Sequence, residues 1–199
     1  MPTLNLGFLA SHGGSNMQSI IDACKSGSLN AIPRCVISNN SKSFALARAE
    51  KEEIPFYHIS SVQYPDPGEL DKAIIRTFLK HEVDTVILAG YMKKLGVSII
   101  RKFKGRILNI HPALLPKYGG KGMYGNFVHE AVLKSEDKVS GPTVHLVDEI
   151  YDNGRILGQQ EVAVLPGDTV ETLSARVLEY EHILYPETIQ KIASGKIKL

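Results

Sequence analysis

Short apolar runs alternate with amphipathic helical patterns over the first 111 residues of the chain. Continuous apolar runs are typical of buried parallel strands, and apolar residues spaced three and four apart predict helices. The pattern predicts strands at 4–10, 34–38, 56–59, 85–89 and 107–111, a helix after residue 16, and helices at 43–52, 69–81 and 97–103. This alternation favours a doubly wound α/β fold with a mostly parallel sheet, helices on both faces and a Rossmann-type N-terminal half.

The pattern changes in the remaining third of the chain. Four glycines between Lys117 and Asn126 predict a flexible lip, and the following residues predict a helix at 127–133 and strands at 141–147 and 156–164. Asp168 and Glu171 fit a capping box at the start of a last helix. That helix is expected to bury these residues: Val170, Leu173, Val177, Tyr180 and Leu184. At 199 residues, the chain is predicted to form a single domain, 1–199.

Composition narrows the possible partners and compartment. The chain is 43% hydrophobic and carries a net charge of +2, which gives no reason to expect binding to nucleic acid. No apolar run is long enough to span a membrane or to form a signal peptide, so we expect no membrane partner. Cys24 and Cys35 are predicted to be reduced thiols in a cytoplasmic protein.

The first strand runs into the sequence Ser-His-Gly-Gly-Ser-Asn and then into a helix. A glycine loop before a helix presents backbone N–H groups that suit a phosphate. Gly13 and Gly14 allow close approach, and Ser15 and Asn16 can cap the helix or bind phosphate oxygens. The alternative is a capped turn without a ligand. The spacing fits neither a dinucleotide-binding nor an ATP-binding motif.

Asn109 and His111 lie two residues apart at the end of a predicted strand that stops at Pro112. Side chains at this spacing share a face, and ligands of open α/β sheets bind at the carboxyl ends of strands. An imidazole beside a carboxylate from the 148–154 loop would have a raised pKa, and an adjacent amide could stabilise an oxyanion. The set suits acyl transfer to an amine. Considered alone, His111 is as readily a structural histidine, and we favour that role for His145.

A second strand end leads into Gly90-Tyr91-Met92-Lys93-Lys94-Leu95. This mixture of apolar bulk and cations could form a pocket wall for a flat, anionic ligand, or it could simply be solvated lysines beside core residues. No paired cysteines and no HExxH or HxH motif occur, so a metal site is not expected.

Together these motifs resemble the folate-dependent formyltransferases. The Asn109-Ile110-His111-Pro112 block and the Leu114-Leu115-Pro116 run carry the resemblance. Further matches are the Gly14-Ser15-Asn16 loop, the segments 88–92 and 140–145, and the Glu181-His182 pair. The resemblance implies an enzyme that transfers the formyl group of 10-formyltetrahydrofolate, its co-substrate, to the amine of glycinamide ribonucleotide in purine biosynthesis. It implies no metal.

The resemblance also implies roles for individual residues. Asn109, His111 and Asp152 would be catalytic, and residue spacing alone could not have chosen Asp152 over Asp148. The phosphate and ribose would bind these residues: Gly14, Ser15, Asn16, Leu178, Glu179, Tyr180 and Glu181. The folate would bind these: Met92, Lys93, Lys94, Leu95, Asn109, Asp148, Glu149, Ile150, Tyr151 and Asp152. The part at about 1–105 would hold the ribonucleotide, and the part at about 106–199 would hold the folate and the catalytic groups.

The chain departs from this family at three places. Lys93 stands where relatives often have arginine. Lysine keeps the positive charge but lacks the bidentate fork of arginine. No arginine occurs around Pro67, and residues 119–124 replace a segment with a histidine, so we assign that segment no catalytic role.

Other functions remain open from the sequence. A 10-formyltetrahydrofolate hydrolase and a tRNA formyltransferase resemble the catalytic block, but they usually carry an additional domain that is not seen here. A non-catalytic nucleotide-binding or folate-binding module need not keep Asn109, His111 and Asp152 together. The chain is expected to be a monomer or a homodimer.

Overall fold

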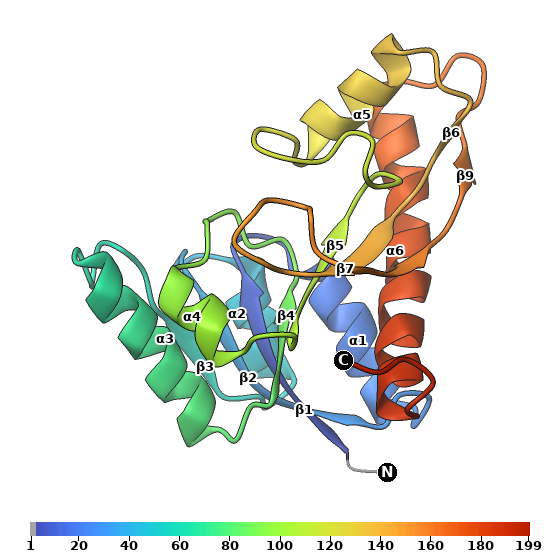
Figure 1. Cartoon of the computed structure of the whole chain (residues 1–199). Helices are drawn as coiled ribbons and strands as arrows, with labels where there is room; N and C mark the ends of the chain where they lie inside the picture. The colour runs from blue at the N-terminus through green and yellow to red at the C-terminus, as the bar shows by residue number, and fades with distance from the viewer. Residues whose placement is uncertain (1–2) are drawn as a thin grey trace.

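A seven-stranded sheet runs through the structure, a computed structural model that describes residues 3–199 (Figure 1). Its strand order is β3-β2-β1-β4-β5-β7-β8. The parallel strands are β1 (Leu4–Ala10), β2 (Ala31–Ser38), β3 (Phe56–His58), β4 (Thr85–Leu88) and β5 (Ile107–His111). β7 (Thr143–Leu146) and β8 (Ile156–Gln159) complete the sheet as antiparallel strands.

Helices cover both faces of this sheet. α1 (Ser15–Lys25), α2 (Phe44–Lys51) and α6 (Val170–Ala193) contribute to one apolar core, whereas α3 (Pro67–Lys80) and α4 (Val97–Lys102) contribute to the other. α5 (Asn126–Lys134) packs against α6 beside a two-stranded sheet of β6 (Val139–Ser140) and β9 (Val162–Ala163) (Figure 1). The predicted α/β class with a mostly parallel sheet is therefore confirmed.

The larger core draws residues from Leu4 to Ala193, so both parts of the sequence share it. Tyr185 of α6 is fully buried against the sheet. Its hydroxyl lies 2.9 Å from the carbonyl oxygen of Leu108 and 3.2 Å from that of Leu88, and it can donate to either. A buried tyrosine hydroxyl normally finds such a partner. The contact fixes α6 against β4 and β5, the strands that lead into the candidate site.

The prediction of one strand over 156–164 is wrong, because this stretch forms two strands in two sheets. The Gln160 N–H donates to the carbonyl oxygen of Pro142 at 3.1 Å, and the chain then turns toward β6. Gly141, between β6 and β7, allows the backbone of Gln160 to approach this closely: its φ is +134°, and a Cβ there would lie 1.9 Å from the carbonyl oxygen of Gln160. Apolar alternation continues through this junction, so periodicity alone does not reveal it.

The start of α6 also differs from the prediction. Thr169 is the N-cap, and it forms the capping box with Thr172, whereas Asp168 pairs with Arg176 at 2.7 Å. Further along the helix, Tyr180 is exposed rather than buried, and Glu181 takes the inward position. Hence the helix delivers a carboxylate, not an aromatic ring, to the end of the sheet.

Candidate active site

Asn109 and His111 lie at the carboxyl end of β5, where β7 pairs with it in antiparallel register. Asn109 is directly opposite His145, and His111 is opposite Thr143. The Thr143 hydroxyl donates to the carbonyl oxygen of Ala113 at 2.6 Å, which holds the chain as it leaves β5. The sheet register therefore places two histidines and an amide within one small region.

The amide of Asn109 is oriented by His145. Nδ1 of His145 donates to the carbonyl oxygen of Leu146 at 2.8 Å, so the neutral ring presents Nε2 as an acceptor. Nδ2 of Asn109 lies 3.1 Å from that Nε2 and donates to it. His145 is buried, and burial lowers its pKa, which favours this neutral form. The second N–H of the Asn109 amide can therefore point toward a substrate.

Asp152 is the acid that joins this group. Its Oδ1 lies 3.6 Å from Nε2 of His145, and its Oδ2 lies 3.7 Å from Nδ1 of His111. The Gly120 N–H donates to Oδ2 at 2.9 Å, and Asp152 itself has a φ of +53°. Asp148, in contrast, accepts from the N–H of Ile150 at 2.8 Å and belongs to the turn. The glycine-rich segment thus contributes a backbone donor to the site, which the sequence did not indicate.

His111 has a defined tautomer because its Nε2 donates to the carbonyl oxygen of Tyr118 at 2.7 Å. Nδ1 is then free to accept a proton when the ring is neutral. Burial lowers the pKa of His111, against the opposing effects of the Asp152 charge and the Tyr118 hydrogen bond. The sequence-based expectation of a raised pKa is therefore wrong: desolvation of the imidazolium outweighs the nearby carboxylate.

The glycine loop lies at the N-terminus of α1, with Gly14 as the N-cap. Its φ is +69°, and a Cβ there would lie 2.9 Å from the Cβ of Ala45, so this position requires glycine. No side chain of the described residues 3–199 caps α1, and Ser15 and Asn16 are its first helical residues rather than caps. The N–H groups of the first turn are thus available to an anion.

Glu181 is the residue of α6 that reaches this loop. Nδ2 of Asn16 donates to its Oε2 at 2.5 Å, and burial raises the pKa of Glu181 to about 7. Glu179 and Tyr180 are exposed, because successive helical residues point in different directions. Leu178 is half-buried. The structure therefore brings Glu181 to the glycine loop and leaves Glu179 and Tyr180 on the helix surface.

The residues expected to contact folate come from two neighbouring segments, the 91–95 stretch after β4 and the 148–152 loop after β7. Nζ of Lys94 lies 5.4 Å from the ring centroid of Tyr151, and Arg101 pairs with Glu149 at 3.9 Å. Met92, Lys93, Lys94, Ile150 and Tyr151 are exposed, whereas Leu95 is buried in the core. The facing apolar and cationic groups suit a flat, anionic ligand, but Leu95 supports this wall from behind.

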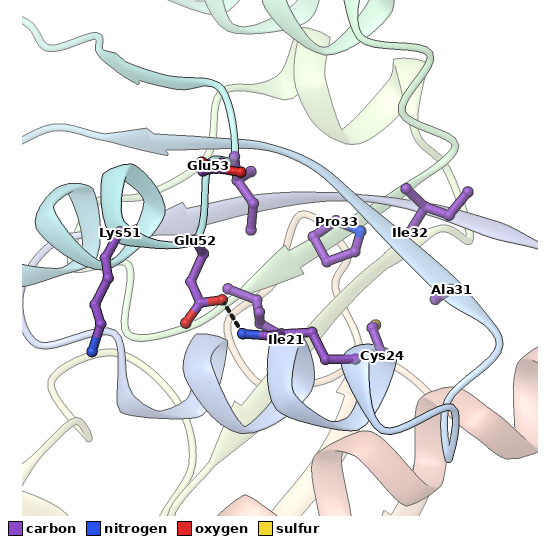
Figure 2. Close-up of a pocket in the computed structure, with 10 residues that line it drawn as sticks. Ile21, Cys24, Ala31, Ile32, Pro33, Lys51, Glu52 and Glu53 are labelled. Atoms are coloured by element: carbon purple, nitrogen blue, oxygen red, sulfur yellow. Dashed lines mark hydrogen bonds and ion pairs between the residues drawn. The ribbon is translucent and has the colours of Figure 1, made fainter.

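A surface pocket of about 440 Å³ lies away from this site. Lysines, glutamates and apolar residues from the end of α1, the start of β2 and the end of α2 line it (Figure 2). Its Lys25 and Glu52 pair with each other at 2.8 Å. The pocket therefore lies at the opposite end of β2 from the strand ends that carry the site.

Two absences apply to the described part of the chain. Within residues 3–199, no helix is long and apolar enough to cross a bilayer. The same residues contain no group of three histidine, cysteine or acidic side chains that could hold a metal ion.

Comparison with known proteins identifies the class. The sequence profile described as "Formyl transferase" matches residues 4–189, so the chain belongs to the formyl transferase family.

Within this family, it is similar to phosphoribosylglycinamide formyltransferases. It is 39% identical to that of Haemophilus influenzae over 96% of this chain and 88% of the relative. It is 44% identical to the chloroplastic protein of Vigna unguiculata over 96% of this chain, but it spans only 62% of that relative's length. The crystal structure of glycinamide ribonucleotide transformylase 1 from Symbiobacterium toebii superposes with a TM-score of 0.93 at 36% identity, covering 99% of this chain and 91% of the other.

Proposed function

We propose that this chain transfers the formyl group of 10-formyltetrahydrofolate to the amine of glycinamide ribonucleotide, giving formylglycinamide ribonucleotide and tetrahydrofolate. The observation that carries the proposal is the convergence of Asn109, His111 and Asp152 at the end of β5. A phosphate-compatible helix start follows β1, and the two segments suited to a flat anion follow β4 and β7, the neighbours of β5 in the sheet. The names of the similar proteins support the same reaction.

The substrates are proposed to bind in the regions that the geometry favours. The ribonucleotide phosphate would bind the first turn of α1, and Glu181 would accept hydrogen bonds from the ribose hydroxyls. The folate ring system would lie between the segment after β4 and the 148–152 loop, with Asn109 at its reacting end. We expect a cytoplasmic enzyme with two small-molecule substrates, as a monomer or a homodimer.

The reaction then follows from the protonation states. The amine nitrogen attacks the formyl carbon, a C–N bond forms, and the carbonyl oxygen becomes an oxyanion. The free N–H of Asn109 donates to this oxyanion. Neutral His111 accepts the proton released by the amine at Nδ1, and Asp152 stabilises the resulting imidazolium. His111 returns that proton to N10 as the bond from N10 to the formyl carbon breaks and tetrahydrofolate leaves.

Release of tetrahydrofolate from 10-formyltetrahydrofolate, measured with and without glycinamide ribonucleotide, tests this proposal. Release that depends on the ribonucleotide would support it. Equal release without the ribonucleotide would contradict it and indicate a hydrolase, in which water replaces the amine. A chain that releases no tetrahydrofolate under either condition would also contradict the proposal.

A further inference from the structure

The segment between β4 and α4, residues 90–96, forms one wall of the proposed folate site without being part of a helix or a strand. We call it the wall segment. Such a stretch has no ladder of its own hydrogen bonds, so its shape depends on contacts with the rest of the chain. Two buried polar side chains from distant parts of the sequence make those contacts, one at each end.

Ser11 holds the first end. It follows β1, is 1% exposed, and its N–H donates to the carbonyl oxygen of Gly90 at 3.0 Å. Its hydroxyl accepts from the N–H of Met92 at 2.8 Å and donates to Oδ1 of Asn39 at 2.5 Å. A single serine thus satisfies two backbone groups of the wall segment and is itself fixed by an amide from the end of β2.

Asp71 holds the other end. It comes from α3 and is 7% exposed, and its carboxylate lies against the backbone of Gly96, the N-cap of α4. A Cβ at Gly96 would lie 1.9 Å from Oδ2 of Asp71, so the carboxylate occupies the space of a capping side chain. The polar groups of Ser98 and Ile99 in the first turn of α4 lower the pKa of this carboxylate, against the larger effect of burial. Asp71 therefore stands where a capping side chain would lie at the start of α4, whose own N-cap is a glycine.

The charge of Asp71 is held against a desolvation cost. Burial raises the pKa of Asp71, because the ionised carboxylate is less stable away from water. The polar groups of Ser98 and Ile99 act in the opposite direction and favour the ionised form. Neither Ser11 nor Asp71 belongs to the residues that would touch a substrate. Their shared target is the wall segment, because Ser11 binds Gly90 and Met92, and Asp71 packs on Gly96.

We propose that Ser11 and Asp71 are positioning residues that hold the wall segment in the shape that receives folate. This inference rests on the proposed function for the identity of the ligand. It predicts that loosening either anchor weakens folate binding and leaves the chemical step nearly intact, since Asn109, His111 and Asp152 are held by other contacts.

The test uses Ser11→Ala and Asp71→Asn in the full chain. We expect KM for 10-formyltetrahydrofolate to rise about two- to tenfold in each variant, the effect of one lost hydrogen bond. We expect kcat to stay within about twofold by the same argument, because the catalytic groups do not move. Amide exchange followed by NMR should become faster at Met92 in Ser11→Ala and at Ser98 and Ile99 in Asp71→Asn.

Matched variants separate positioning from loss of stability. Ser60 is a buried serine whose hydroxyl lacks a hydrogen-bond partner within residues 3–199, so Ser60→Ala should leave KM for folate unchanged. Asp66 caps α3 through the N–H of Glu69 at 2.8 Å, so Asp66→Ala should lower stability without raising KM for folate. If Asp71→Asn fails to fold, Ser98→Ala takes its place, because it removes an exposed polar side chain that favours the charge of Asp71.

Calorimetric titration with 10-formyltetrahydrofolate alone keeps the two proposals apart. A wild-type chain that binds folate but shows no ribonucleotide-dependent turnover contradicts the proposed function, and the Kd of the variants still tests the anchors. Folded variants with unchanged folate Kd and KM contradict the positioning role. Equal rises in KM for folate in the Ser60→Ala control would contradict it as well.

Discussion

Oδ2 of Asp152 lies 3.7 Å from Nδ1 of His111, which is too long for a hydrogen bond and short enough for a strong charge interaction. His111 already donates from Nε2 to Tyr118, so a proton added to its ring must go to Nδ1, the atom that faces the carboxylate. The pair is therefore arranged to stabilise a charge that forms during the reaction rather than one present at rest.

The first prediction concerns this pair. His111→Ala and Asp152→Asn should each lower kcat about 10²–10³-fold, because one removes the proton acceptor and the other removes the charge that stabilises its protonated form. Steady-state turnover measures the effect. Asp22→Asn is the control, since Asp22 is an exposed carboxylate of α1 outside both proposed binding regions. Near wild-type turnover in either test variant would contradict the proposed roles.

Local sequence pattern was sufficient for part of this site. Alternation along a strand put Asn109 and His111 on one face, and Pro112 marked where the strand ends. The five parallel strands and their helices also followed from periodicity, because each is a short segment whose burial repeats at a fixed interval. Such features depend on residues a few positions apart.

Features that depend on long-range packing could not be predicted. His145 joins the site only because β7 pairs with β5 in antiparallel register, which places it opposite Asn109. The choice of Asp152 over Asp148 depends on a turn in which Asp152 adopts a positive φ. The direction of the His111 pKa shift depends on how deeply the ring is buried.

The second prediction concerns the orientation of Asn109. His145→Ala should lower kcat about tenfold, because the Asn109 amide loses the acceptor that fixes it and can rotate its oxygen toward the oxyanion. In Asn109→Ala, the further change His145→Ala should have little effect, since its partner is already gone. A double-mutant cycle on kcat measures this coupling. Additive losses would show that His145 acts independently of Asn109.

The third prediction is a loss of stability in mild acid. Burial lowers the pKa values of His111 and His145, so the unfolded state takes up protons first as the pH falls below about 6.5. The free energy of unfolding contributed by these histidines is therefore present above that pH and is lost as the pH falls through their folded-state pKa values. Urea unfolding between pH 7.5 and 5 measures this slope.

His145→Gln should reduce this dependence on pH, because glutamine does not titrate. An equal slope in wild type and His145→Gln would show that His145 does not contribute.

The last prediction concerns Glu181, whose titration acts in the opposite direction. Burial raises its pKa to about 7, so the folded state favours the neutral acid. Its contribution to stability is fully present below the unfolded-state pKa and is lost as the pH rises through about 7. Glu181→Gln should therefore increase the free energy of unfolding at pH 8 by roughly 1–3 kcal/mol and change it little at pH 5.

The same variant separates stability from binding. Glutamine can still meet Asn16, but it loses the charge proposed to accept from the ribose hydroxyls, so KM for the ribonucleotide should rise about tenfold while KM for folate stays unchanged. Glu179→Gln, on the exposed face of α6, should alter neither the free energy of unfolding nor KM for the ribonucleotide. Equal unfolding free energies for wild type and Glu181→Gln at both pH values would contradict the titration argument. A rise in KM for folate alone would contradict the proposed contact between Glu181 and the ribose.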